Sequence, residues 1–275
     1  MTVALTLLRK HLAESRWVLG ISAAALFAFG WLGVYFIARG QRQMRDRGAQ
    51  EFIRRMMSSD GGEITTGMIE VAFWVHPFVW LPIIAWAISR GSLAIAGELE
   101  RGTLDLILSR PVRRSTYLLS QAATGVVGLL VLGAALVVGN LVGTAVHGID
   151  GPPSALALSR PGLNLAALGF CVFGVTLFFS SLDIVRWRSN LIASALAIAS
   201  FAAWVIASTV PVLRGTDWEK WLYRVSIFTA YNPVDAIGRA LVLGRHLAVL
   251  GGIGSGGILL GLLVFAQRDL PSSAG

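Results

Sequence analysis

The amino-acid sequence predicts an all-α membrane protein with six transmembrane helices. Hydrophobic residues make up 55% of the 275 residues and charged residues only 14%, whereas soluble domains typically carry ~25% charged residues. The mean hydropathy is +0.69. The apolar residues gather in six uncharged windows, each long enough, at ~17–25 residues, to cross a hydrocarbon core of ~30 Å. The predicted spans are residues 17–38, 71–89, 118–146, 164–182, 189–213 and 246–267.

Helices are expected in these windows because backbone polar groups in lipid must be satisfied within the segment itself. The second window contains His76-Pro77, and a proline inside a helix predicts a kink or a freed backbone carbonyl there. We find no fixed-period repeat and no soluble segment, so residues 1–275 are interpreted as one membrane domain. The first window is longer than the apolar core of a signal peptide and follows Arg9, Lys10 and Arg16, which predicts a retained anchor.

An even number of spans places both termini on one side of the membrane. Basic residues are almost evenly divided between the two sides, so the total charge does not decide the orientation. The basic N-terminus and the short turn with Arg186 and Arg188 favour cytoplasmic termini. We therefore expect a multi-pass protein of the inner (plasma) membrane. The basic residues lie on both membrane flanks and form no single stripe, so no nucleic-acid partner is expected.

The segments on the opposite side have patterns of their own. In residues 40–59, apolar residues at i, i+3, i+4 spacing predict a helix that lies in the headgroup plane or continues the first span. Residues 214–245 are rich in aromatic side chains and contain the break Asn232-Pro233. This composition predicts an interface anchor or a pair of short helices before the last span. Residues 148–161 are interpreted as a connector.

A polar island, residues 97–114, separates the second and third apolar windows. Thr103 is a plausible N-cap, with Asp105 in the first turn, where a helix dipole favours an anion. Apolar residues follow, and Pro111 ends the helix. The island therefore predicts a short helix on the membrane surface. It is either a docking element or an ordinary amphipathic turn at the interface.

The residues of this island resemble the signature of type-2 ABC transporter permeases. The resemblance rests on Glu98-x-Glu100-x-Gly102-Thr103-Leu104, on Leu106 and Leu108, and on Pro111-Val112-x-Arg114. The chain is similar in length and architecture to the permeases of nitrous oxide reductase maturation and of antibiotic export. One departure is Gln121, which stands where the family commonly has a lysine.

The resemblance implies a coupling helix between spans 2 and 3 that sits in a groove of a cytoplasmic ABC ATPase. It also implies an N-terminal interfacial helix over residues 2–15, two copies of the ATPase, and a homodimer or a heterodimer with a similar permease. The implied ATPase-coupling residues are Glu98, Glu100, Gly102, Thr103, Leu104, Arg110, Pro111 and Arg114.

Chemistry of its own is not expected in this chain. A Walker motif needs a glycine-rich loop before a lysine, and neither Lys10 nor Lys220 has one. ATP and Mg²⁺ are therefore expected on the partner ATPase, with no cofactor or metal here. No carboxylate relay lies within the apolar windows, which argues against a proton- or sodium-coupled transporter.

The sequence thus predicts the membrane-spanning permease subunit of an ATP-driven ABC transporter, interpreted as an exporter. The alternative is a subunit that does not transport and instead relays ATPase work to an extracytoplasmic accessory protein, with residues 41–66 as its docking surface.

Overall fold

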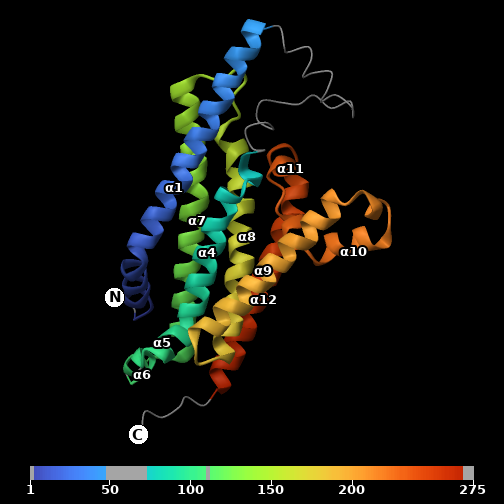
Figure 1. Cartoon of the computed structure of the whole chain (residues 1–275). Helices are drawn as coiled ribbons and strands as arrows, with labels where there is room; N and C mark the ends of the chain where they lie inside the picture. The colour runs from blue at the N-terminus through green and yellow to red at the C-terminus, as the bar shows by residue number, and fades with distance from the viewer. Residues whose placement is uncertain (1–2, 48–72, 110–111, 269–275) are drawn as a thin grey trace.

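The computed structural model describes residues 3–47, 73–109 and 112–268 (Figure 1). All regular elements within these residues are helical, and six helices are long and apolar enough to cross a membrane. The predicted all-α class with six spans is therefore confirmed. The candidate spans are Leu5–Arg42, Pro77–Glu100, Arg114–His147, Ala155–Leu182, Arg186–Thr209 and Leu241–Gln267.

Short helical segments connect the long helices at both ends of the bundle. The α-helices are α1 (Val3–Arg47), α4 (Pro77–Ser92), α5 (Glu98–Glu100), α6 (Thr103–Leu108), α7 (Arg114–His147), α8 (Ala155–Leu182), α9 (Arg186–Thr209), α10 (Asp217–Val225), α11 (Pro233–Gly238) and α12 (Ala240–Gln267). The other segments are the 3₁₀-helices η1 (Phe73–Val75), η3 (Pro211–Leu213) and η4 (Ile227–Ala230) and the π-helix η2 (Leu93–Gly97).

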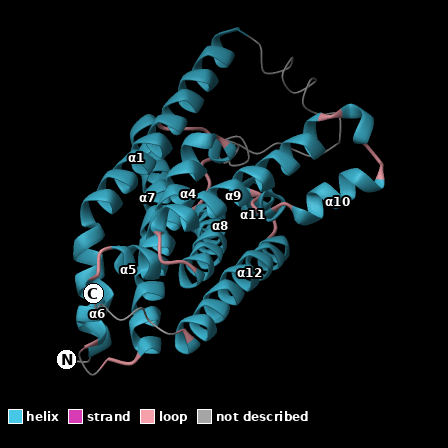
Figure 2. Ribbon diagram, turned by 60° about the horizontal axis from the view of Figure 1, so that its bottom comes forward, coloured by secondary structure: helices cyan, strands magenta, loops and turns pink. Residues whose placement is uncertain are grey.

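Helix α8 forms the centre of the bundle and contacts α4, α7, α9, α11 and α12. In the turned view of Figure 2, α1 and α12 lie on the two sides and α10 points away from the bundle. Gly174 of α8 and Gly254 of α12 let these helices approach so closely that neither position has room for a Cβ. In the most apolar window of α8, 67% of the residues are buried, against 17% in α9. Helix α9 therefore leaves most of its surface open to lipid or to another subunit.

The two ends of the bundle are easily distinguished in Figure 1. The first residues of α1, the last residues of α12, and α5 and α6 lie together at its lower end, which we call the α6 end. The end of α1 near Arg42, the end of α7 at His147 and the start of α8 lie at the upper end, which we call the opposite end.

The N-terminal stretch is part of a single long helix. We predicted a separate interfacial helix over residues 2–15, but α1 continues without a break from Val3 to Arg47. No proline interrupts this range, and His11 and Ser15 are buried against the bundle. The His11 ring meets the edge of the Tyr117 ring at a centroid distance of 5.9 Å. The predicted continuation of the first span beyond residue 38 is confirmed as far as Arg47, and residues 48–59 lie outside the described residues.

The second span begins later and ends later than predicted. Helix α4 starts at Pro77, and His76 is its N-cap, whose Nδ1 accepts a hydrogen bond from Phe78 N at 3.3 Å. The predicted kink at His76-Pro77 is therefore wrong, because a proline at the first helical position opens a helix instead of bending it. At its other end the span runs through η2 to Glu100, eleven residues beyond the predicted limit at Ser89.

Two further boundaries differ from the prediction. Helix α8 starts at Ala155, inside the predicted connector, because Ser154 Oγ accepts a hydrogen bond from Ala157 N and caps the helix; Pro161 lies within it. Helix α9 ends at Thr209 and not at Leu213, since a proline at 211 disfavours helical geometry in the preceding residue.

The segment between α9 and α12 contains the predicted pair of short helices. Thr216 caps α10, and Asn232 caps α11 with Pro233 at the first helical position. Asn164 of α8 holds this segment in place: its Nδ2 donates to Ala230 O at 2.8 Å, and its Oδ1 accepts from Asn232 N at 3.0 Å. The Tyr231 hydroxyl donates to Trp74 O at 2.7 Å, and burial raises the pKa of this phenol, so it remains a donor.

Candidate functional site

The polar island predicted to form a surface helix is a direct continuation of the second span. Helix α4 passes into the π-helix η2, then into α5, and after a turn at Arg101 and Gly102 into α6. A π-helical turn displaces backbone groups from the regular hydrogen-bond pattern of an α-helix. The surrounding helices satisfy these groups, and the way they do so connects η2 to both α7 and α8.

Ser180 of α8 is the main partner of the π-helix. Its Oγ accepts hydrogen bonds from Ile95 N at 3.2 Å and Ala96 N at 2.9 Å and donates one to Ser92 O at 3.0 Å. The Ser180 side chain is fully buried. One hydroxyl group therefore completes two backbone interactions of η2 and one of the last residue of α4, and the π-helix cannot shift without losing them.

A second chain of hydrogen bonds connects the π-helix to α7. The Tyr117 hydroxyl donates to Ala94 O at 2.8 Å, and Gln121 Nε2 donates to the Tyr117 oxygen at 2.9 Å. Gln121 Oε1 in turn accepts from Arg90 Nη2 at 2.9 Å. All of these side chains are buried, so α4, η2 and α7 share one polar network that is shielded from solvent.

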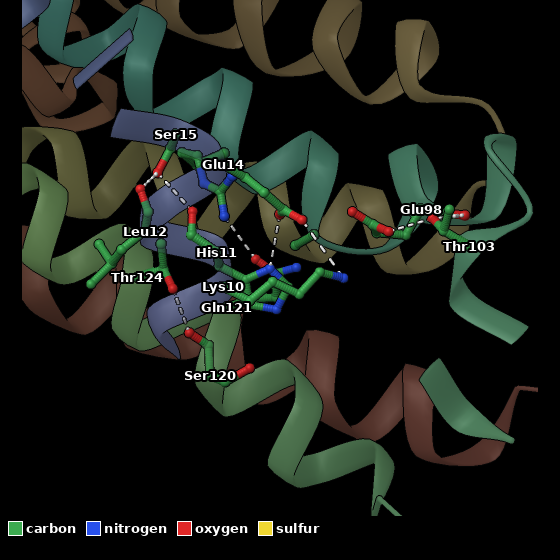
Figure 3. A network of polar contacts seen from close by, with 12 residues as sticks. Lys10, His11, Leu12, Glu14, Ser15, Glu98, Thr103, Ser120, Gln121 and Thr124 are labelled. Carbon is green, nitrogen blue, oxygen red and sulfur yellow. Dashed lines mark hydrogen bonds and ion pairs between the residues drawn. The ribbon is translucent and has the colours of Figure 1, made fainter. Parts of the chain in front are cut away.

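Figure 3 shows the surroundings of this network. In this view His11 and Glu14 of α1 lie near Gln121 of α7. His11 Nδ1 lies 3.4 Å from a Glu14 carboxylate oxygen. The His11 ring also meets the Tyr117 ring, so the first turns of α1 lie against the polar network beneath α5.

Glu98, Gly102 and Thr103 form the corner between α5 and α6. Glu98 is buried, and its carboxylate accepts a short hydrogen bond from the Thr103 hydroxyl, which also lies 3.2 Å from Glu98 O (Figure 3). The predicted N-cap at Thr103 is wrong: Gly102 occupies that position, with φ of 67° and no side-chain cap. Only glycine adopts this φ without strain, so Gly102 fixes the direction in which α6 leaves the span. The prediction that Asp105 lies in the first turn is confirmed.

Glu100 joins α5 to the start of α9. Its Oε2 accepts a hydrogen bond from Arg186 N, the first residue of α9, at 3.0 Å. A carboxylate at this position satisfies an unpaired backbone donor and interacts favourably with the helix dipole. The Arg186 guanidinium then reaches back to Ser89 and Ser92 of the second span. This pair of residues fastens α9 to the region where α4 passes into η2.

Arg114 does not face outward from the bundle. Its Nη1 donates to Phe265 O at 3.2 Å and to Arg268 O at 2.6 Å, so it caps the C-terminus of α12. Arg268 in turn donates to Ser181 O at 2.8 Å and Asp183 O at 2.9 Å at the end of α8. Two guanidinium groups thus connect the ends of α7, α12 and α8.

The remaining predicted residues divide into buried, exposed and undescribed positions. Leu104 is fully buried and anchors α6 to the bundle, so its side chain is not available at the surface. Leu106 is 70% exposed, and Glu100, Arg101, Gly102 and Ser109 are exposed beside it. Arg110 and Pro111 lie outside the described residues. Any contact of these residues with an ATPase stays a prediction.

The residues that hold the π-helix are not among the site residues predicted from the sequence. Arg90 stood just outside the predicted second span, and Gln121 was noted only as a missing lysine. The signal that could have identified them is a polar side chain within or beside an apolar window, because such a group in a membrane needs a partner. Ser180, Tyr117 and Gln121 all meet that description.

A comparison with known families agrees with this architecture. Residues 9–234 match a family model described as ABC-2 family transporter protein. A search of curated proteins finds no match. The matched range contains the π-helix, α5, α6 and the helices that hold them. The chain therefore belongs to the ABC-2 transporter family and is a multi-pass membrane permease.

Proposed function

We propose that this permease subunit is an exporter driven by a separate cytoplasmic ABC ATPase that docks on the exposed surface of α5 and α6. In this proposal the α6 end faces the cytoplasm, which also places both termini there. Two ATPase subunits serve two permease copies, either identical or similar in sequence. ATP and Mg²⁺ bind to the ATPase and not to this chain.

One observation carries the proposal: η2 and α5, which lead directly into α6, are bound to three other membrane spans by polar contacts. The π-helix is bound to α7 through Tyr117 and to α8 through Ser180. Glu100 binds the start of α9. A force applied to α6 by a partner therefore reaches α4, α7, α8 and α9 together, as expected of an element that transmits a movement.

Such coupling requires that ATP binding favour one conformation of the membrane helices over another. Allosteric coupling free energies are typically about 1–3 kcal/mol. A handful of buried hydrogen bonds, at about 0.6 kcal/mol each within membranes, is of this size. The network around η2 is thus strong enough to hold one arrangement and weak enough for nucleotide binding to alter it.

The experiment that tests the proposal uses two matched glycines. Gly102→Pro and Gly148→Pro both place a proline at a positive φ, of 67° and 60°, and both remove one backbone hydrogen bond. Gly102 lies at the α5–α6 corner and Gly148 at the end of α7. We expect Gly102→Pro to abolish the effect of the permease on ATPase activity in reconstituted complexes, with membrane insertion intact.

The control should retain most of that effect, because Gly148 lies at the opposite end of the bundle. Normal coupling in Gly102→Pro, or an equal loss in both variants, contradicts the proposal. The double variant Glu98→Ala, Glu100→Ala provides a second test, since it removes the contacts with Thr103 and Arg186. It should uncouple ATP hydrolysis from transport without releasing the protein from the membrane.

A further inference from the structure

A pocket at the opposite end of the bundle contains two arginines, a tyrosine and a histidine. It has a volume of about 270 Å³ and is lined by Tyr35, Ala38, Arg39, Arg42 and His147. The first four residues follow i, i+3, i+4, i+7 spacing on α1 and therefore share one face of that helix. His147 is the last residue of α7. The candidate spans of α1 and α7 end at Arg42 and His147, so the pocket lies at the depth of the lipid headgroups or just beyond them.

The pocket concentrates positive charge that the described part of the chain does not neutralise. Among the described residues, neither Arg39 nor Arg42 forms an ion pair with a carboxylate. Asp150, in the loop after α7, is not among the lining residues; its backbone N donates to Gln41 Oε1. Like charges on one helix face repel each other. A bound anion would relieve this repulsion.

The donors of the pocket are held in place and only partly used. Arg39 Nη1 donates to the Tyr35 hydroxyl at 3.0 Å, and Arg42 Nη2 donates to His147 O at 2.9 Å. Each guanidinium has five N–H donors, so most of them are not used by the described part of the chain. These two hydrogen bonds therefore fix the positions of both side chains and leave other N–H groups of each guanidinium for a ligand.

His147 adds a ring nitrogen from the second helix. Its Nε2 is buried and has no hydrogen-bond partner among the residues that the structure describes. Its ring is fixed by Trp31 and Tyr35, at centroid distances of 5.0 Å and 5.3 Å. A buried ring nitrogen without a partner is costly unless a ligand or water completes it.

We propose that this pocket binds a phosphate-type anion, either the headgroup of an anionic phospholipid or a free phosphate ester. A planar guanidinium donates two parallel hydrogen bonds to phosphate oxygens, and two such groups with His147 surround one anion. The volume is at the lower limit for ligand sites, which suits a headgroup and not a drug-sized molecule. The proposal is independent of the function assigned to α6.

Binding is measured by calorimetry on the full-length protein purified in detergent. The probes are dihexanoyl phosphatidylglycerol, glycerol 3-phosphate and inorganic phosphate, with dihexanoyl phosphatidylcholine as a lipid without net charge. We expect at least one anionic probe to bind and the choline lipid to bind at least tenfold more weakly. Binding of the anionic lipid alone identifies a headgroup site, whereas binding of glycerol 3-phosphate or phosphate identifies a site for free anions.

The variants Arg39→Gln and Arg42→Gln should each weaken that binding at least tenfold, because each removes charge-assisted hydrogen bonds. The matched control is Arg214→Gln, which removes an exposed arginine that does not line the pocket and should leave the dissociation constant unchanged. Arg39→Lys and Arg42→Lys keep the charge and should show an intermediate loss, which guards against variants that fail to fold. No binding of any anionic probe, unchanged binding in the glutamine variants, or an equal loss in Arg214→Gln overturns the proposal.

Discussion

Four arginines at the α6 end and the two pocket arginines at the opposite end are used in different ways. At the α6 end, the guanidiniums of Arg114, Arg186 and Arg268 cap or join helix ends, and that of Arg90 is buried against Gln121. At the opposite end, Arg39 and Arg42 are exposed and bind only a hydroxyl and one carbonyl among the described residues.

This difference separates two tasks that a charged side chain can perform in a membrane protein. A guanidinium whose donors are used by backbone carbonyls holds helices together and transmits movement between them. A guanidinium with available donors at a lined pocket attracts a ligand. The comparison therefore predicts a stability cost for changes at the α6 end and a binding cost for changes at the opposite end.

The largest effect is expected for Gln121→Leu. This change leaves the buried Arg90 guanidinium without its hydrogen-bond acceptor and removes the bond that the Tyr117 oxygen accepts from Gln121, so it should lower the free energy of unfolding by about 2–3 kcal/mol. The measurement is unfolding in mixed micelles by detergent titration. Arg90→Met combined with Gln121→Leu should cost clearly less than the sum of the single changes, because the buried charge is removed as well. Additive costs would show that the pair does not interact.

The next effect is expected for Ser180→Ala, which removes two hydrogen bonds to the π-helix and one to the last residue of α4. At about 0.6 kcal/mol for each bond, the cost is about 2 kcal/mol. The matched control is Ser181→Ala, since Ser181 is equally buried but donates only to Phe178 O in its own helix. An equal loss of stability in the two variants would show that Ser180 stabilises the fold no more than Ser181 does.

A smaller effect is expected for Arg114→Ala, which exposes the carbonyl groups at the end of α12. We expect a loss of about 1 kcal/mol, against almost none for Arg113→Ala, whose side chain is exposed beside it. Hydrogen exchange of the last turn of α12 reports the effect locally. Faster exchange in both variants, or in neither, would mean that Arg114 does not fasten this helix.

The smallest effect on stability is expected for Arg39→Gln without added anion. The bond from Arg39 to the exposed Tyr35 hydroxyl contributes little, and removal of one of two like charges offsets it. The free energy of unfolding should change by no more than about 0.5 kcal/mol. A loss above about 1 kcal/mol would mean that the pocket arginine Arg39 is structural too, and the comparison would fail.

The sequence predicted the fold class and the number of spans because hydrophobic length alone determines both. It also predicted a short helix in the polar island, since Asp105 and the following leucines carry local signals. The end of the second span was missed because a π-helix depends on tertiary partners: Ser180 and Tyr117 are distant in the sequence from the backbone groups that they bind.

The roles of individual site residues could be predicted only in part. Leu104 was expected at a partner contact, yet it is buried, because the side of α6 that faces the bundle follows from the φ of Gly102 and not from the local pattern. Arg114 was expected near an ATPase, yet it caps α12, a helix more than a hundred residues away. Such contacts follow from the three-dimensional arrangement and cannot be predicted from the spacing of residues along the sequence.

The central claim is that the α6 end receives the ATPase. Two leucines test it directly: Leu106 on α6, 70% exposed, and Leu241 near the start of α12, 93% exposed. A photoreactive amino acid is placed at each position in turn in the assembled complex, and crosslinks to the ATPase are measured. The account predicts a crosslink from position 106 and none from position 241. A crosslink from 241, or none from 106 in an intact complex, would contradict it.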